Sequence, residues 1–179
     1  TDPVVYMPRY YLSYWLFNGE VFNLAEKFLM HIWEKGDLKN YFARKSLELL
    51  FDLIAYQYDP DSIEKVGEIF INETIANVSE DHPSVHFLMK KYALFLYEEE
   101  KYDKAFAYYN RLWNLLKDKL DSNRPFLLEI RVYMGECAVY TGNPEAGLEI
   151  STSVWDFIKT QREDVYMFVK SACSLVKIN

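Results

Sequence analysis

Residues Tyr92 to Trp113 read YALFLYEEEKYDKAFAYYNRLW, and this stretch decides the fold. Apolar residues recur at helical spacing on both sides of a polar break at Lys101 and Tyr102. A small residue lies in each apolar half, Ala93 in the first and Ala105 in the second. The pattern predicts two helices joined by a short turn.

The rest of the chain repeats this pattern in register. Small residues in the first helix of each unit are 42, 38 and 42 residues apart: Ser13, Ala55, Ala93 and Gly135. A second small residue follows each of them at a constant offset: Ala25, Gly67, Ala105 and Gly147. A large apolar residue follows later in the second helix: Trp33, Ile75, Trp113 and Trp155. Antiparallel helices approach closely where bulk is missing, so the small residues predict the crossings and the large residues predict contacts with the next unit.

This spacing resembles the tetratricopeptide repeat (TPR) family. In that family, helix A carries a small residue with a large apolar residue three positions later, and helix B carries a second small residue. Ala55 with Tyr58, Ala93 with Leu96, and Ala105 just after Tyr102 match this pattern. The period of about 40 residues exceeds the 34 of the standard repeat. It resembles the longer repeats of kinesin light chains and of bacterial peptide-sensing regulators.

The resemblance implies an all-α, right-handed superhelix (α-solenoid) of about four antiparallel helix pairs plus a C-terminal helix. We expect a single domain over 1–179 that is a fragment of a longer protein. The predicted repeats and terminal helix span 4–36, 38–79, 82–121, 124–160 and 162–177. Expected helix starts include a cap at Asp37, a cap at Asp61 or Ser62, and the pairs His82-Pro83 and Arg124-Pro125.

The composition favours a protein-binding domain over other classes. Aromatic residues make up 17% of the chain, and such residues cover large areas at low entropy cost. The net charge of -7 argues against direct binding of nucleic acid by this domain. Cys137 and Cys173 are too few for a disulfide framework and fit reduced thiols, so we expect a cytoplasmic location and no membrane association.

A TPR-like solenoid implies binding along the face lined by the first helix of each pair. Positions -3, +1 and +4 from the first small residue are expected to face this groove. They include Tyr10, Tyr14, Phe17, Asp52, Tyr56, Asp59, Lys90, Leu94, Tyr97, Glu136 and Val139, with Val132 at the remaining position. An aromatic groove with few charges suits a protein or peptide segment with apolar anchors. The alternative is that these aromatics pack against neighbouring helices.

Other sites are less well supported by the residues. Chaperone-binding TPR domains clamp a carboxylate with Lys and Asn, whereas Tyr10 and Tyr14 occupy the equivalent positions here. His82 and His86 are four residues apart but lack a further ligand at close spacing, so no metal is expected. Cys137 has no motif partner in the sequence and fits a core residue. We therefore predict no catalytic site and no cofactor.

Two functions remain open from the sequence. The first is a non-catalytic scaffold or adaptor that holds a partner segment in the groove. The second is a peptide-sensing regulatory domain of a larger transcription regulator or signalling protein. Self-association into a homo-oligomer is a further expectation, because a solenoid that ends on an apolar face favours it.

Overall fold

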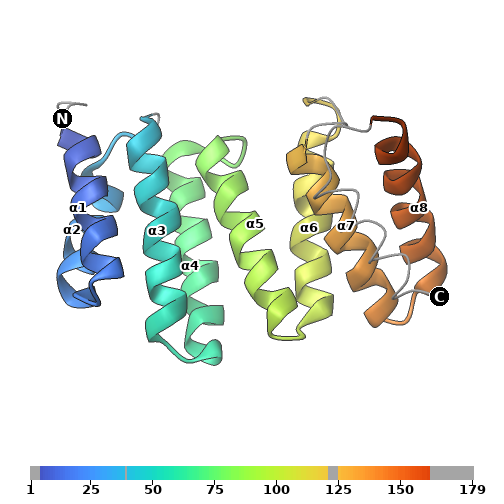
Figure 1. The fold of residues 1–179 in the computed structure, drawn as a ribbon, viewed down its shortest axis with the longest axis horizontal. Coiled ribbons are helices and arrows are strands. Elements are labelled where there is room, and N and C mark those ends of the chain that lie inside the picture. Colours follow the sequence, from blue (N-terminus) through green and yellow to red (C-terminus); the bar gives the residue numbers. More distant parts are fainter. Residues whose placement is uncertain (1–4, 39, 121–124, 162–179) are drawn as a thin grey trace. The chain divides into compact units, whose positions relative to one another are not determined.

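The computed structural model describes residues 5–38, 40–120 and 125–161 of the 179-residue chain. Within these ranges the chain forms eight helices that follow one another as antiparallel pairs (Figure 1). They are α1 (Tyr6–Asn18), α2 (Phe22–Lys35), α3 (Tyr41–Gln57), α4 (Pro60–Val78), α5 (Pro83–Glu98), α6 (Tyr102–Leu116), α7 (Pro125–Tyr140) and α8 (Pro144–Gln161). The predicted all-α fold of helix pairs is confirmed. The predicted terminal helix over 162–177 and Cys173 lie outside the described residues.

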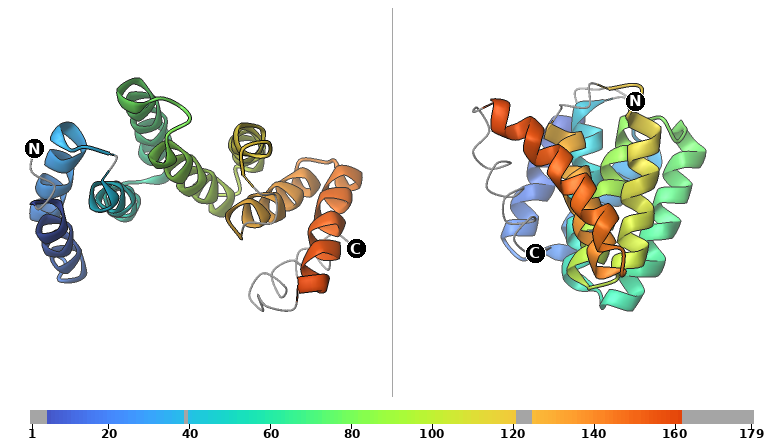
Figure 2. Two further views of the ribbon diagram at one scale, coloured as in Figure 1. Left: turned by 90° about the horizontal axis from the view of Figure 1, so that it is seen from above. Right: turned by 90° about the vertical axis from the view of Figure 1, so that its right-hand side faces the viewer.

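The chain divides into two compact units, Thr1–Lys91 and Tyr92–Asn179. Unit 1 holds α1 to α4 and the first part of α5, whereas unit 2 holds the rest of α5 and α6 to α8. In unit 1, α1 packs against α2 and α3, and α2 also packs against α3. In unit 2, α7 packs against α6 and α8, and Figure 2 shows α7 and α8 side by side.

Proline and capping residues set the starts of the helices. Pro60, Pro83, Pro125 and Pro144 each open a helix, where the missing N–H has no intrahelical partner to lose. The starts predicted at His82-Pro83 and Arg124-Pro125 are therefore confirmed for the helices that begin at these prolines.

Two predicted caps are wrong. Asn40, not Asp37, caps α3, and its side-chain oxygen accepts from the backbone N–H groups of Phe42 at 2.8 Å and Ala43 at 3.4 Å. Asp59, not Asp61 or Ser62, caps α4 by accepting from the backbone N–H of Ser62 at 3.0 Å. In both cases the capping residue lies at the position where the backbone is still extended, immediately before the first helical residue.

The small residues lie in the core, as the register predicts. Ala25, Ala93 and Ala105 are fully buried, and Gly67 is buried in α4. Ala55 is an exception, because it is only half-buried. Gly135 and Gly147 mark a close approach between α7 and α8. A Cβ atom on Gly147 would lie 2.7 Å from the backbone oxygen of Gly135, so only glycine fits this crossing.

The large residues of the second helices contact the following repeat. The rings of Trp33 in α2 and Phe70 in α4 have centroids 4.4 Å apart. The guanidinium of Arg131 in α7 lies 5.1 Å from the ring centroid of Trp113 in α6. These contacts confirm the role predicted for Trp33 and Trp113.

None of the helices that the structure describes is both long and apolar enough to cross a membrane.

Candidate protein-interaction surface

The first helices of unit 1 carry an exposed aromatic surface, which we call the α1–α3 face. Its aromatic residues come from the predicted groove and from their direct neighbours. They are Tyr10, Tyr11, Tyr14 and Phe17 of α1, Phe22 at the start of α2, and Tyr41, Phe42 and Tyr56 of α3. Because α1 and α3 run in the same direction, aromatic rings from the two helices meet near both ends of α3.

One end of the α1–α3 face is built around Phe42. Its ring centroid lies 5.9 Å from that of Tyr10 and 6.0 Å from that of Tyr11. Tyr14 lies one helical turn beyond Tyr10 and keeps 44% of its surface exposed. Burial raises the pKa of the Tyr10 phenol, with nearby Lys45 opposing this shift and Glu48 adding to it.

The other end of the α1–α3 face is built around Tyr56. Its ring centroid lies 6.3 Å from that of Phe17 and 5.0 Å from that of Phe22. Tyr56 is nevertheless 67% exposed, so these two rings contact one side of it and leave the other side open to solvent. An aromatic ring held in place but uncovered is a typical anchor for a partner protein.

Paired charges lie between the two aromatic ends. One side of α3 carries residues spaced by three or four positions: Tyr41, Lys45, Glu48, Asp52 and Tyr56. Lys45 contacts Glu48 at 2.7 Å. The two carboxylate oxygens of Asp52 accept from Lys91 in α5 at 2.6 and 2.7 Å. Because each cation has an anion beside it, the α1–α3 face offers polar contacts without a strong net field.

Sequence reasoning missed several residues of this surface. Lys91 contacts Asp52, whereas the repeat register selects the adjacent Lys90 as a groove residue. Lys45 also lies 5.8 Å from the ring centroid of Phe87. The signal for Lys45 and Glu48 was present, since helical spacing from Asp52 selects them. Asp59 is exposed but acts as the cap of α4, so its carboxylate is already in use.

In unit 2 two of the predicted groove residues, Tyr97 and Glu136, take part in a packed tyrosine cluster. The hydroxyl of Tyr97 donates a hydrogen bond to a carboxylate oxygen of Glu136, and Glu136 is only 5% exposed. Burial and this hydrogen bond raise the pKa of the Tyr97 phenol. The Tyr97 ring also meets the edges of Tyr102 and Tyr133, with centroids 5.5 and 5.0 Å away.

Stacked rings extend the cluster on both sides. Tyr109 is fully buried and stacks on Tyr133 at 5.4 Å, and Tyr102 stacks on Tyr140 at 4.2 Å. Tyr102, Tyr109 and Trp113 of α6 therefore all pack against residues of α7.

The remaining groove positions of unit 2 are partly or fully covered. Leu94 and Val139 are half-buried, and Val139 contacts the backbone of α8 where Gly147 leaves room for it. The inward position predicted for Val132 is wrong, because this residue is buried with Leu128, Val154 and Ile158 between α7 and α8.

Cys137 lies on the buried side of α7 and has no exposed surface. Burial, reinforced by the neighbouring charge of Glu136, raises the pKa of the Cys137 thiol to about 12. A thiol held protonated and covered in this way is a poor nucleophile, so the structure supports its interpretation as a core residue.

These features define the class of fold: the described residues form the consecutive antiparallel helix pairs of a TPR-like fold. Among solved structures it is similar to two crystal structures of the Podosopora anserina putative kinesin light chain with nearly identical TPR-like repeats, one of them of a variant chain. The TM-scores are 0.74 and 0.72 at 13% sequence identity, over 99% of this chain and 86% of theirs. Comparison with family models and curated protein sequences finds no match. At this identity the similarity shows the fold alone.

Proposed function

We propose that the chain is a non-catalytic module that binds a protein or peptide segment on the α1–α3 face. The observation that carries this proposal is the exposure of Tyr56 and Tyr14 on two parallel helices, with Tyr56 held by the rings of Phe17 and Phe22 and Tyr14 beside the ring of Tyr10. Binding sites for proteins concentrate their energy in a few large, well-held aromatic residues of this kind.

The charges between the two ends suggest the chemistry of the partner. Lys45 and Asp52 each keep about a third or more of the side chain exposed, so both signs of charge are available to a partner. An extended or helical segment with two apolar anchors and polar residues between them would match this order of contacts. The distance between the two aromatic ends would then favour partner segments with a matching spacing of apolar anchors. The charges between the ends would favour one direction of the bound segment.

The proposal can be tested without a known partner. A displayed library of random linear peptides is selected on the whole chain, and recovered peptides are titrated by fluorescence anisotropy. The double variant Tyr14→Ala/Tyr56→Ala should weaken binding at least about tenfold, since each exposed ring would be a major contact. Its far-UV circular dichroism should match that of the wild type.

Tyr58→Ala is a matched control for Tyr56. Tyr58 is also an exposed tyrosine, two residues further along, but it lines a different side of unit 1. Peptides that bind the α1–α3 face should bind this variant as they bind the wild type. Recovered peptides that bind Tyr14→Ala/Tyr56→Ala at wild-type strength would contradict the proposal, as would a selection that recovers no peptide.

A further inference from the structure

Unit 1 has a second apolar surface, which lies between the second helices of its two pairs. We call it the α2–α4 cleft. It has a volume of about 350 Å³, and its lining includes Ile54 from α3 and Tyr58, the residue that follows α3. Ligand pockets have volumes of roughly 300 to 1,000 Å³, so this cleft has room for a few apolar side chains. None of the residues that define the α1–α3 face lines this cleft, although α3 contributes Ile54 to it.

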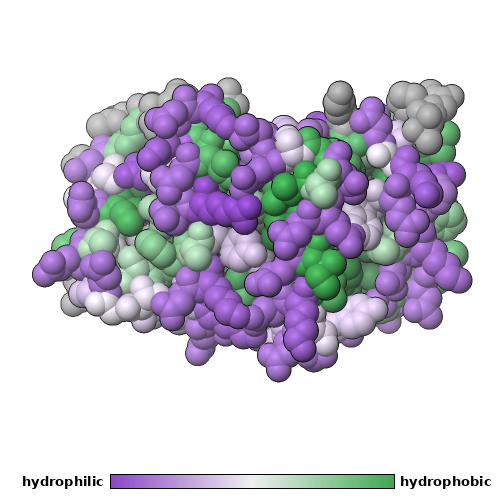
Figure 3. Space-filling view, turned by 180° about the vertical axis from the view of Figure 1, so that it is seen from behind, coloured by the Kyte–Doolittle hydropathy of each residue, from purple (hydrophilic) through white to green (hydrophobic). Residues whose placement is uncertain are grey.

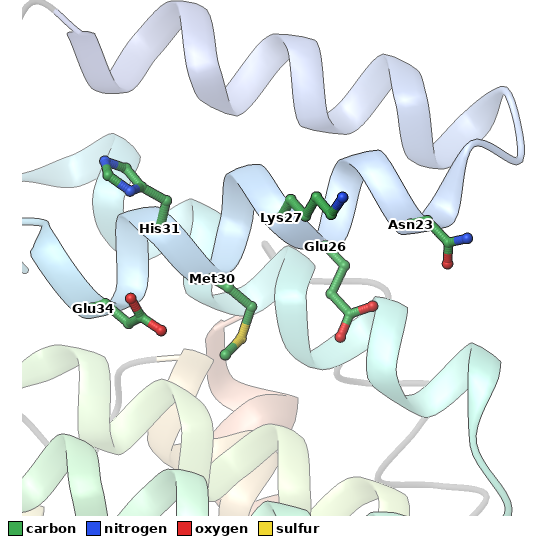
Figure 4. Close-up of a pocket in the computed structure, with 6 residues that line it drawn as sticks. All are labelled: Asn23, Glu26, Lys27, Met30, His31 and Glu34. Atoms are coloured by element: carbon green, nitrogen blue, oxygen red, sulfur yellow. The ribbon is translucent and has the colours of Figure 1, made fainter.

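The α2 wall of the cleft carries acidic and apolar residues on one side of the helix. Figure 4 shows Glu26, Met30 and Glu34 pointing to the same side of α2, and Lys27 and His31 pointing elsewhere. Glu26 and Met30 line the cleft together with Trp33. Because these residues recur every three or four positions, they form a continuous stripe along α2.

The α4 wall is an apolar stripe that ends in an acid. Val66, Ile69, Phe70 and Glu73 follow one another at helical spacing and line the cleft. Ile69 is 56% exposed, although it lies in the middle of a packed helix. Figure 3, which views the molecule from behind, shows apolar residues over α4 bordered by hydrophilic ones. A large apolar side chain left open beside a cleft marks an interaction surface.

The two acidic residues stand at opposite ends of the cleft. The contact between Trp33 and Phe70 sets the register of the two parallel helices. In this register Glu26 precedes the contact and Glu73 follows it. They are about ten residues apart along the helix direction, which corresponds to about 15 Å. No Lys, Arg or His is among the described residues that line the cleft.

We propose that the α2–α4 cleft binds a basic amphipathic helix of a partner protein. The two parallel walls form a groove along which a helix can lie, with its apolar side chains reaching Met30, Ile69 and Tyr58. A cationic residue at each end of its apolar stripe, about three turns apart, would then reach Glu26 and Glu73. The chain's net charge of -7 favours approach of such a helix and disfavours an acidic one.

The proposal is tested with designed peptides rather than an unknown partner. The first peptide is a helix of about fifteen residues based on Ala and Gln, with three leucines on one side and an arginine at each end of that side. The second has glutamate in place of both arginines. Binding of each labelled peptide is measured by fluorescence anisotropy against the wild type and two charge-reversed variants with the same net charge.

Wild-type protein should bind the arginine peptide at least about tenfold more tightly than the glutamate peptide, because two ion pairs distinguish them. Glu26→Lys/Glu73→Lys should reverse this preference. The matched control Glu68→Lys/Glu149→Lys changes two exposed acids outside the cleft and should keep the preference. Ile69→Ser should weaken binding of the arginine peptide severalfold.

Three results would overturn the proposal. The first is no binding of the arginine peptide by wild-type protein at millimolar concentration. The second is an unchanged preference in Glu26→Lys/Glu73→Lys. The third is that Tyr14→Ala/Tyr56→Ala no longer binds the arginine peptide, which would place the peptide on the α1–α3 face. Because the cleft and the α1–α3 face are probed by different variants, failure of this proposal leaves the proposed function to its own test.

Discussion

The two units use the same repeat position in opposite ways. Tyr56 in unit 1 and Glu136 in unit 2 each follow the first small residue of their repeat by one position. Tyr56 is 67% exposed above its supporting rings, whereas Glu136 is 5% exposed and accepts a hydrogen bond from Tyr97. The repeat register therefore determines which side of a helix a residue occupies. Whether that side is open depends on the size and polarity of the neighbours.

The largest difference between the units should appear in stability. Tyr109→Ala in unit 2 removes a fully buried ring that stacks on Tyr133, and it should destabilise the protein by roughly 4 kcal/mol. Tyr56→Ala should cost less than about 0.5 kcal/mol, because the ring is largely exposed. Urea denaturation followed by circular dichroism measures both. Equal costs would break the distinction between a packed cluster in unit 2 and an open face in unit 1.

Alkaline pH should test the packing of unit 2. The Cys137 thiol has its pKa raised from 9.0 to about 12 in the folded protein. The native state therefore keeps a proton that the unfolded chain releases. The contribution of Cys137 is complete below pH 9, and stability should fall by about 1.4 kcal/mol per pH unit between pH 9 and 12.

The variant Cys137→Ala isolates this effect. In this variant the free energy of unfolding should no longer fall between pH 9 and 10. The decline that begins near pH 10, where half-buried Tyr97 and buried Tyr109 also resist ionisation, should persist. Identical slopes for the wild type and Cys137→Ala between pH 9 and 10 would show that the thiol is not buried.

Two hydroxyl deletions within the tyrosine cluster should have opposite signs. Tyr97→Phe removes the hydrogen bond to buried Glu136 and should destabilise the protein by about 2 kcal/mol. The hydroxyl of Tyr109 is buried, and the part of the chain that the structure describes offers it no hydrogen-bond partner. Tyr109→Phe should therefore be neutral or stabilising by up to about 1 kcal/mol. Thermal unfolding compares the two, and a large loss in Tyr109→Phe would reveal a partner for this hydroxyl.

The fold could be predicted from the sequence because it depends on a repeated physical constraint. Close helix crossings need small residues, and the series that includes Ala25, Ala105 and Gly147 reports those crossings at a fixed offset. The caps were less predictable. Asp37, Asn40, Asp59 and Ser62 are all good capping types, and the choice among them depends on where the backbone turns into the helix.

The candidate site could be predicted only in part. Register alone selects Tyr14 and Tyr56 as candidates, and both are exposed because in unit 1 the register position coincides with an open surface. Tyr97 was expected to face a groove, but it packs with Tyr102 and Tyr133 instead. One helix cannot reveal this outcome, since it depends on rings that other helices bring to the same place. The α2–α4 cleft could not be predicted in this way, because the register positions that mark the expected groove lie on the first helix of each pair.

One titration tests the contrast between the units most directly. A peptide selected on the wild-type protein is titrated against Tyr56→Ala and against Tyr140→Ala, which removes an exposed tyrosine of unit 2 that stacks on Tyr102. We predict that Tyr56→Ala weakens binding about tenfold and that Tyr140→Ala leaves it unchanged. Loss of binding in Tyr140→Ala together with wild-type binding in Tyr56→Ala would contradict the account.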